Sequence, residues 1–354
     1  MYLRIKSIKQ NTMKKWLVIL WFSLLSTKLL AQSLGSLMVV NKGGNTMSIL
    51  DLDLNTELTR IPTGEGSHEV AVSPDGKIAV VCNYGNQTPN NSLTIIDIAQ
   101  KSSIKKIDLG IYQRPHGIEF IAPEEVIVTS EVAQALIKVN IKTDAVTEVV
   151  KTNQEGSHIV AYCKADGKAY VANRRSGSVS VVDVKGNKLL KTIVLKPGTE
   201  GLDISPNGKE LWVANQIDST VTIINAQTFK EEALLYAHQN AIRVKFLPNG
   251  KYSLISNAKT GNVSVYDVAA RRLIKDIDLF NLDKGIEGLG KEKDLKNPPM
   301  PVGITTHPSG KFVYIAAVNY GTIAVIDTAN WEVVATIRAG ASPDGLYHSP
   351  LKIN

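Results

Sequence analysis

Three histidines stand at the start of similar short apolar segments. They are His68 in GSHEVAVSPDG, His116 in RPHGIEF and His158 in GSHIVAYCKADG. Imidazole titrates near neutral pH, so these residues could act as general acids or bases, and they could also ligate Zn²⁺, Cu²⁺ or Fe²⁺. Their recurrence indicates one structural position used three times, which requires a repeated element to carry it.

That element is a unit of 41 or 42 residues, because Gly167, Gly208 and Gly250 mark the same turn at those spacings. Each unit contains four short β-prone segments, such as GLDIS, ELWVAN, TVTIINA and EEALLY, with no competing helical period. Units of this length with four strands are typical of β-propeller blades.

The chain holds seven such units. Copies of the second strand begin near Leu37, Ile78, Val126, Ala169, Glu210, Tyr252 and Phe312. Copies of the innermost strand begin at Glu69, Gly117, Ile159, Gly201, Arg243, Gly303 and Gly345. We therefore predict an all-β, seven-bladed propeller of four-stranded antiparallel blades. The C-terminal strand should complete the blade begun by the three N-terminal strands, which would remove exposed sheet edges.

The repeat motifs also resemble a known family. YVANRRSGSVSVVD, LWVANQIDSTVTIIN, VYIAAVNYGTIAVID and ATIRAGASPDG are similar to the YVTN-type (surface-layer or YncE-like) β-propeller repeat, over residues 36–349. The resemblance implies the seven-bladed fold. It implies little about activity, since relatives include surface-layer proteins, periplasmic propellers, the haem d1 domain of nitrite reductase and lactonase-like propellers. Ala317 departs from the pattern, because the other copies usually have asparagine there.

In such a blade the innermost strand starts at the mouth of the central channel. The residues aligned at that position, here called the mouth column, are His68, His116, His158, Glu200, Ile242, Val302 and Asp344. Ring closure puts Asp344 beside His68, so the column becomes an imidazole and carboxylate arc followed by two aliphatic residues. Three interpretations stay open: hydrogen bonding to loops at the mouth, a metal or ligand site on His68, His116 and His158, or a catalytic site on the same histidines.

Other residues should lie near the same mouth. Arg174 and Arg175 in NRRSGS could bind an anion or could be ordinary solvated turn residues. His238 lies four residues before the column residue Ile242 and could approach the same face. The recurring asparagines after the second strands are expected to be structural: Asn41, Asn83, Asn173, Asn215 and Asn257. A long insertion at residues 279–301 is expected over the mouth, as a lid, a contact surface or a passive loop.

The N-terminus is typical of an export signal. Residues 1–31 contain six basic residues and no acidic one, and the apolar run from Trp16 to Leu25 is shorter than the about 20 residues that a spanning helix needs. We expect a signal peptide at 1–31, with translation starting at Met1 or Met13, and a single propeller domain at 32–354. A membrane anchor is the alternative. The protein should then be periplasmic or extracellular.

Charge and cysteine content narrow the partners. The formal net charge of +7 belongs mostly to the leader, so the remaining chain is nearly neutral and gives no electrostatic argument for nucleic acid. Cys82 should lie at the mouth end and Cys163 at the opposite end of the ring, too far apart for a disulfide.

Two functions remain open. The first is an exported, monomeric binding or scaffold propeller that takes a small molecule, a glycan or a protein at its polar mouth. The second is a propeller enzyme, such as a metal-dependent oxidoreductase, a lactonase or a lyase, that uses the histidines with or without a divalent transition metal.

Overall fold

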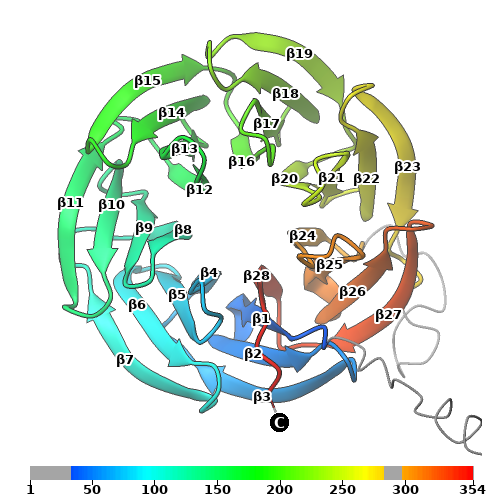
Figure 1. The fold of residues 1–354 in the computed structure, drawn as a ribbon, viewed down its shortest axis with the longest axis horizontal. Coiled ribbons are helices and arrows are strands. Elements are labelled where there is room, and N and C mark those ends of the chain that lie inside the picture. Colours follow the sequence, from blue (N-terminus) through cyan, green and yellow to red (C-terminus); the bar gives the residue numbers. More distant parts are fainter. Residues whose placement is uncertain (1–32, 283–296, 354) are drawn as a thin grey trace, which may run out of the picture. The chain divides into compact units, whose positions relative to one another are not determined.

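The computed structural model describes residues 33–282, 297–353, and these form seven four-stranded antiparallel sheets that are arranged as the blades of a ring (Figure 1). The predicted seven-bladed propeller is therefore confirmed. The predicted signal peptide and most of the insertion, residues 283–296, lie outside the described residues. No helix in the described part of the chain has the length and apolar character to cross a membrane.

The strands follow one another from the inside of each blade to its outside. The first blade contains β28 (Pro343–Ser349), β1 (Ser36–Asn41), β2 (Thr46–Asp51) and β3 (Thr56–Pro62); the second, β4 (Ser67–Val72), β5 (Ile78–Gly85), β6 (Pro89–Asp97) and β7 (Ser102–Asp108); the third, β8 (Pro115–Ala122), β9 (Glu125–Ser130), β10 (Ala135–Asn140) and β11 (Ala145–Lys151). The fourth contains β12 (Ser157–Cys163), β13 (Lys168–Asn173), β14 (Ser178–Asp183) and β15 (Lys188–Val194); the fifth, β16 (Thr199–Ile204), β17 (Glu210–Asn215), β18 (Thr220–Asn225) and β19 (Glu231–Tyr236). The sixth contains β20 (Ala241–Phe246), β21 (Tyr252–Asn257), β22 (Asn262–Asp267) and β23 (Arg272–Asp278); the seventh, β24 (Pro301–Thr306), β25 (Phe312–Ala317), β26 (Thr322–Asp327) and β27 (Glu332–Arg338). Two short 3₁₀ turns, η1 (Lys42–Gly44) and η2 (Val318–Tyr320), follow β1 and β25.

The hydrophobic core lies between neighbouring blades. The second and third strands are apolar on both faces because each blade is covered by a blade on either side. Trp212 of β17, for example, is fully buried and its ring packs edge-on against Phe246 and Tyr266 of the next blade, at centroid distances of 5.4 and 6.2 Å. The outermost strands alternate exposed and half-buried residues instead, as expected for sheet edges.

The ring is closed by its two termini. β28 is hydrogen-bonded antiparallel to β1, with Leu346 opposite Val39 and His348 opposite Leu37. The Ser349 hydroxyl also donates to the Gly76 carbonyl of the second blade, at 2.7 Å. The predicted closure is confirmed. The C-terminal strand β28 is the innermost strand of the first blade, so the inner edge of β1 is not left unpaired.

Each inner strand begins with a β-bulge. The pairing of β4 with β5 shifts register between Ser67 and Val70, and all six other inner strands shift at the same place. A bulge breaks the usual alternation of side chains, so the mouth-column residue and the next residue can both face the channel. In four blades that next residue is glycine. At Gly303 a Cβ atom would lie 1.9 Å from the Asp344 carbonyl oxygen, so glycine permits the neighbouring inner strand to approach.

The recurring asparagines have the structural role that was predicted for them, although they bond across strands rather than within turns. Asn173 donates to Ser178 and Ser180 of β14 and accepts from Ser157 of β12, all at 2.9–3.1 Å. In the seventh blade Ala317 occupies this position. There the buried Thr322 hydroxyl has no hydrogen-bond partner among the described residues, which shows what the missing amide would supply.

The two cysteines are buried and are not joined in a disulfide, as predicted. Cys82 lies on the second strand of its blade and Cys163 at the end of an inner strand.

Candidate ligand site at the channel mouth

The bulges bring the polar arc of the mouth column together. His68, His116, His158, Glu200 and Asp344 are all at most 8% exposed, and with Ile242 and Val302 they line a cavity of about 420 Å³. We call this the upper cavity. Its volume falls within the range of small-molecule sites.

Loops that emerge at the same end complete the wall of the upper cavity. The polar contributions come from Lys42 of η1, Tyr84 of β5, Arg114 before β8, Arg174 between β13 and β14, and Gln216 after β17. Met300, the last residue before β24, and Val318 of η2 extend the aliphatic side with Ile242 and Val302. One side of the cavity is therefore charged and aromatic, and the other is apolar. The described end of the insertion reaches the mouth through Met300.

The three imidazoles stack on one another instead of converging on one point. Ring centroids of His116 and His158 are 3.6 Å apart, those of His68 and His116 are 4.9 Å apart, and Tyr84 packs edge-on against His116 at 5.5 Å. Within the described residues, no group of three or more His, Cys, Asp or Glu side chains is arranged to hold a metal ion. This geometry favours stacking and electrostatic interactions with a ligand over coordination of a metal ion.

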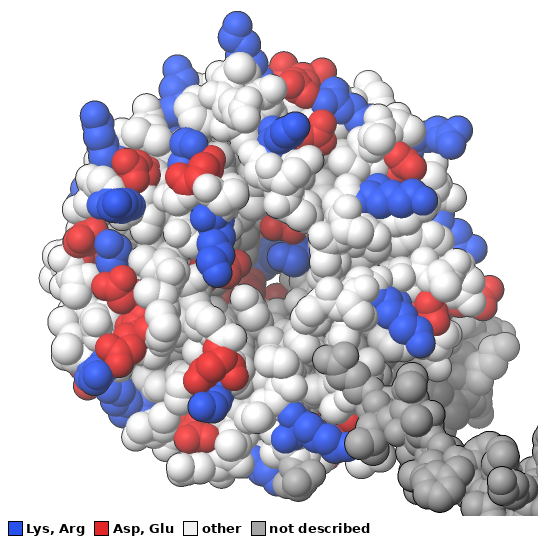
Figure 2. All heavy atoms as spheres, in the orientation of Figure 1, with Lys and Arg blue, Asp and Glu red and all other residues white. Residues whose placement is uncertain are grey.

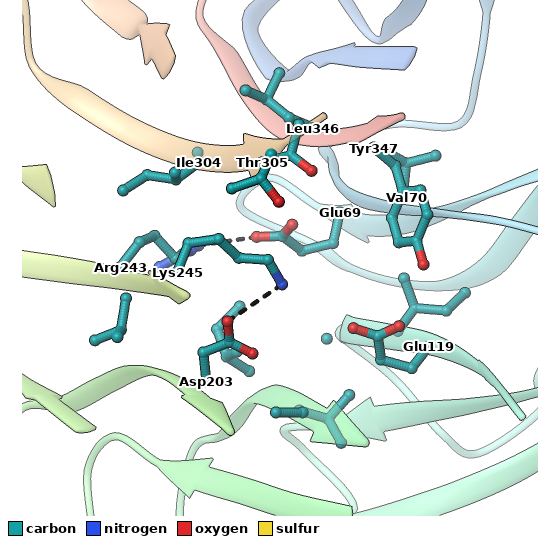
Figure 3. A pocket seen from close by; sticks show the side chains of 18 of the residues that line it. Glu69, Val70, Glu119, Asp203, Arg243, Lys245, Ile304, Thr305, Leu346 and Tyr347 are labelled. Atoms are coloured by element: carbon teal, nitrogen blue, oxygen red, sulfur yellow. Dashed lines mark hydrogen bonds and ion pairs between the residues drawn. The ribbon is translucent and has the colours of Figure 1, made fainter. Parts of the chain in front are cut away.

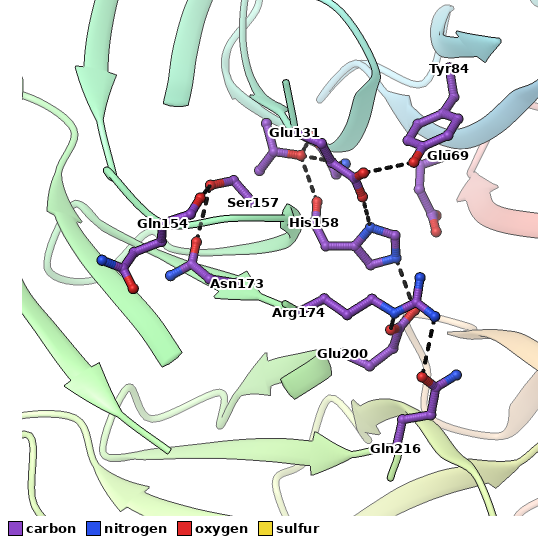
Figure 4. A network of polar contacts seen from close by, with 12 residues as sticks. Glu69, Tyr84, Glu131, Gln154, Ser157, His158, Asn173, Arg174, Glu200 and Gln216 are labelled. Carbon is purple, nitrogen blue, oxygen red and sulfur yellow. Dashed lines mark hydrogen bonds and ion pairs between the residues drawn. The ribbon is translucent and has the colours of Figure 1, made fainter. Parts of the chain in front are cut away.

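His158 is held between two carboxylates (Figure 4). Its Nδ1 lies 2.5 Å from Glu131 Oε1 and its Nε2 lies 2.9 Å from Glu200 Oε1. Burial lowers the pKa of His158, but the two carboxylates outweigh it and raise the pKa to about 9. His158 is therefore an imidazolium at neutral pH, with both N–H groups donated. It has no lone pair to offer to a metal or to a substrate proton.

The two carboxylates are themselves anchored. Tyr84 donates its hydroxyl to Glu131 at 2.7 Å, and Arg174 Nε lies 2.6 Å from Glu200 Oε2. Burial raises the pKa of Glu200, but His158, Arg243 and Arg174 together lower it to about 2. The network thus links blades around the mouth into one rigid wall of the cavity.

His68 and His116 are electrically different from His158. Burial lowers the pKa of His68 to about 4, and burial next to two other histidines lowers the pKa of His116 well below its ordinary value. Both rings are neutral at pH 7. The Gly66 carbonyl lies 2.8 Å from His68 Nδ1 and can only accept, so we assign the proton to Nδ1 and the lone pair to Nε2.

Of the three other predicted site residues, one lines the upper cavity and two do not. Arg174 lies at the cavity, paired with Glu200 and 3.4 Å from Gln216. Arg175 and His238 are not among the residues that line it. His238 is instead exposed and paired with Asp276 at 2.9 Å, because it lies two residues after the outermost strand β19.

An ion pair across the channel forms the floor of the upper cavity. Arg243 of β20 and Glu69 of β4 belong to blades on opposite sides of the ring, and their Nη2 and Oε1 atoms are 2.8 Å apart (Figure 3). Arg243 also lies 3.6 Å from Glu200. Both residues directly follow the mouth column, where four of the other five blades have glycine, and the absence of side chains there leaves room for the bridge.

Comparisons with known proteins support the fold and do not identify a function. No protein-family model matches the chain, and no curated protein matches its sequence. Solved structures with similar folds include Kuenenia stuttgartiensis hydrazine synthase, at 19% identity over 83% of this chain and 93% of that chain with a TM-score of 0.71. Dihydro-heme d1 dehydrogenase NirN in complex with DHE matches at 15% identity over 86% of this chain and 64% of that one, with a TM-score of 0.60. A functionally unknown protein from Desulfotomaculum acetoxidans matches at 12% identity over 90% and 100%, with a TM-score of 0.70. The YVTN-type resemblance remains a prediction.

Proposed function

We propose that the protein is an exported binding propeller whose upper cavity takes a small organic anion with an apolar body. The observation that carries this proposal is a pair of basic side chains at the cavity without acidic partners. Among the described residues, no ion pair engages Lys42 or Arg114, and Arg114 is held by the Asn86 and Gln87 carbonyls with its guanidinium over the Tyr84 ring.

The remaining charges of the upper cavity nearly balance. Glu131 and Glu200 are matched by His158 and Arg174, and Arg243 is matched by Glu69. Asp344, which has no ion pair among the described residues, is the remaining carboxylate of the wall, so the two basic residues Lys42 and Arg114 exceed it by one charge. A carboxylate or phosphate entering the cavity would therefore meet Lys42 and Arg114 as its counter-ions, and charge-assisted hydrogen bonds of this type are the strong ones. The aliphatic side formed by Ile242, Val302 and Met300 would take the carbon skeleton.

The charge distribution on the face drawn in Figure 2 supports binding of a ligand in the central channel rather than on the outer surface of the ring. Basic and acidic side chains are interspersed around that face, and charged atoms of both signs lie in its central hollow. The figure offers no continuous basic surface for nucleic acid on this face.

The test is calorimetric titration with hexanoate, hexanol and hexylamine, which differ chiefly in charge. We expect hexanoate to bind and to lose at least about ten-fold in affinity in each of Lys42→Gln and Arg114→Gln, since a charge-assisted hydrogen bond contributes roughly 1.5–3 kcal/mol. Lys251→Gln, which alters an exposed lysine away from the cavity, is the matched control. Equal affinity for hexanoate and hexanol, or for all variants, would contradict the proposal.

A propeller enzyme is the second candidate, favoured by the orientation of His68. A neutral imidazole whose Nδ1–H is fixed by a carbonyl presents a basic Nε2, which is the arrangement of a general base. If a bound ligand is converted during incubation and His68→Gln abolishes conversion while binding persists, the protein is an enzyme. Recovery of the ligand unchanged supports the binding role.

A further inference from the structure

A second cavity lies on the other side of the Arg243–Glu69 bridge. It has a volume of about 450 Å³ and is lined by the lower halves of the inner strands (Figure 3). We call this the lower cavity. Its polar lining includes the bridge itself, Thr306 and His348, and a set of residues three places after the mouth column, namely Glu119, Asp203, Lys245, Thr305 and Tyr347.

The charges of the lower cavity are unequally satisfied. Lys245 Nζ lies 3.4 Å from Asp203 Oδ2, and the same carboxylate oxygen accepts from the Phe246 backbone N–H at 2.9 Å. The Glu119 carboxylate, in contrast, has no hydrogen bond or ion pair within the described part of the chain. Figure 3 shows Glu119 directed into the cavity, with the hydroxyl of Tyr347 in the same space.

A carboxylate in this position is costly unless something compensates it. Burial raises the pKa of Glu119 to about 7, because Lys245 lowers it only in part and Asp203 raises it further. Glu119 is half-buried at the wall of the cavity, and a carboxylate there is compensated by an ion pair, by a bound cation or by protonation. The described part of the chain supplies no ion pair to Glu119, although it supplies a roomy cavity beside it.

We propose that the lower cavity binds a small protonated organic amine, with its ammonium group on the Glu119 carboxylate. The Tyr347 hydroxyl oxygen would accept a hydrogen bond from the ammonium group, and the Tyr347 ring would form a cation–π contact with it. Val70, Ile304 and Leu346 line the same cavity and would pack against a short carbon chain. This site does not depend on the upper cavity, whose basic residues select the opposite charge.

The geometry favours an organic amine over a metal ion. Among the described residues, only one unengaged carboxylate faces the space, since Asp203 is already bonded to Lys245 and to a backbone N–H. Hard divalent cations require six or more oxygen ligands. An amine needs one carboxylate and a few hydrogen-bond acceptors.

The experiment is calorimetric titration of the purified protein with n-butylamine, n-butanol and butyrate. We expect n-butylamine to bind more tightly than the other two, and Glu119→Gln to weaken it at least ten-fold. Gln is isosteric and Glu119 has no partner to lose among the described residues, so this variant should fold. Glu124→Gln, which alters an exposed carboxylate in the turn after the same strand, is the matched control and should leave binding unchanged.

Two further measurements test whether the Glu119 carboxylate itself holds the amine. At pH 7 the titration, repeated in buffers of different ionisation enthalpy, should show release of about half a proton per amine from Glu119, and none in Glu119→Gln. Tyr347→Phe should weaken n-butylamine without abolishing its binding. The groups that face Glu119 and titrate or carry charge are Asp203, Lys245, Glu69 and Tyr347. Burial raises the pKa of Glu119 to about 7, and burial also raises the pKa of Glu69, so the Glu119→Gln variant identifies which carboxylate releases the proton. The pKa of Tyr347 is raised far above the pH of the titration.

The outcomes are distinct for the two cavities. Arg114→Gln should weaken hexanoate and leave n-butylamine unchanged, while Glu119→Gln should do the reverse. Equal affinity for n-butylamine and n-butanol, unchanged affinity in Glu119→Gln, or no amine binding up to ~10 mM would overturn the lower-cavity proposal. None of these results would affect the proposal for the upper cavity.

Discussion

The stability of the fold should fall as pH rises from 6.5 to 9, and His158 should cause that fall. Its pKa is about 9 in the folded chain against an ordinary value of 6.5. The folded state therefore binds this proton more firmly than the unfolded state does. The resulting stabilisation, about 3 kcal/mol, is complete below pH 6.5 and is lost as pH rises through 9.

The variant that isolates this effect is His158→Gln. It is neutral at every pH, so it leaves Glu131 and Glu200 without their cation and should be destabilised by about 3–5 kcal/mol at pH 6.5. Between pH 6.5 and 9 it should lose little further stability, whereas the wild-type protein should lose about 3 kcal/mol. The difference between the two proteins should thus shrink by about 3 kcal/mol, to roughly 0–2 kcal/mol at pH 9.

The measurement is urea unfolding at pH 6.5, 7.5 and 9, followed by tryptophan fluorescence and circular dichroism. His116→Gln is the control, because His116 is neutral throughout this range and its replacement should leave the wild-type pH dependence intact. The alkaline range is chosen because on the acidic side Glu200 and His68 both destabilise the fold as they gain protons. Parallel losses in the wild-type protein and in His158→Gln would refute the imidazolium assignment.

Three further perturbations test the fold that carries the site. Removing residues 343–354 deletes β28 and should abolish soluble, cooperatively folding protein, with recovery on adding the matching peptide; a stable truncated ring would contradict the closure. Asn173→Ala should lower the free energy of unfolding by about 3 kcal/mol, since it removes three buried hydrogen bonds at about 1 kcal/mol each, and a loss below ~0.5 kcal/mol would count against that role. Gly303→Ala should cost about 1–3 kcal/mol or more because its Cβ meets the Asp344 carbonyl, whereas Gly44→Ala, with its nearest contact at 3.4 Å, should be nearly neutral in the same urea titration.

The architecture was predictable because it repeats. Turn glycines at a constant spacing and four β-prone segments per unit define the blade, and seven copies define the ring. The observed strands begin within two residues of the predicted positions, as at Ile78 for β5 and Ser67 for β4. The same alignment identified the mouth column, because a residue at a repeated position returns to the same height in every blade.

The chemistry of the column was less predictable, because types of side chain do not determine protonation. His68, His116 and His158 are equivalent in the alignment, yet one is an imidazolium and two are neutral. The difference arises from Glu200, which the alignment did place in the column next to His158, and from Glu131. Glu131 follows a second strand in a neighbouring blade and carries no repeat signal. Loop residues such as Lys42 and Arg114 were missed for the same reason, since loops vary between blades.

The floor of the upper cavity did have a sequence signal. The position after the mouth column is glycine in four blades, isoleucine in one, and oppositely charged in the remaining two, Glu69 and Arg243. Opposite charges in a column that otherwise lacks polar side chains predict a pair. Recognising it required knowing that a bulge turns two successive residues toward the channel, because regular alternation would direct one of them into the blade interface.

The Arg243–Glu69 ion pair also separates the charges of the upper cavity from those of the lower cavity. Arg243 contacts Glu69 and lies near Glu200, so it connects the carboxylate network of the upper cavity to the lining of the lower one. Because Arg243 lies between Glu69 and Glu200, its positive charge is compensated and contributes little to the net charge of either cavity. The net charge on each side is then set by residues outside the bridge: Lys42 and Arg114 against Asp344 above, and Glu119 below. A channel of nearly neutral overall charge can in this way present an anion site at one end and a cation site at the other.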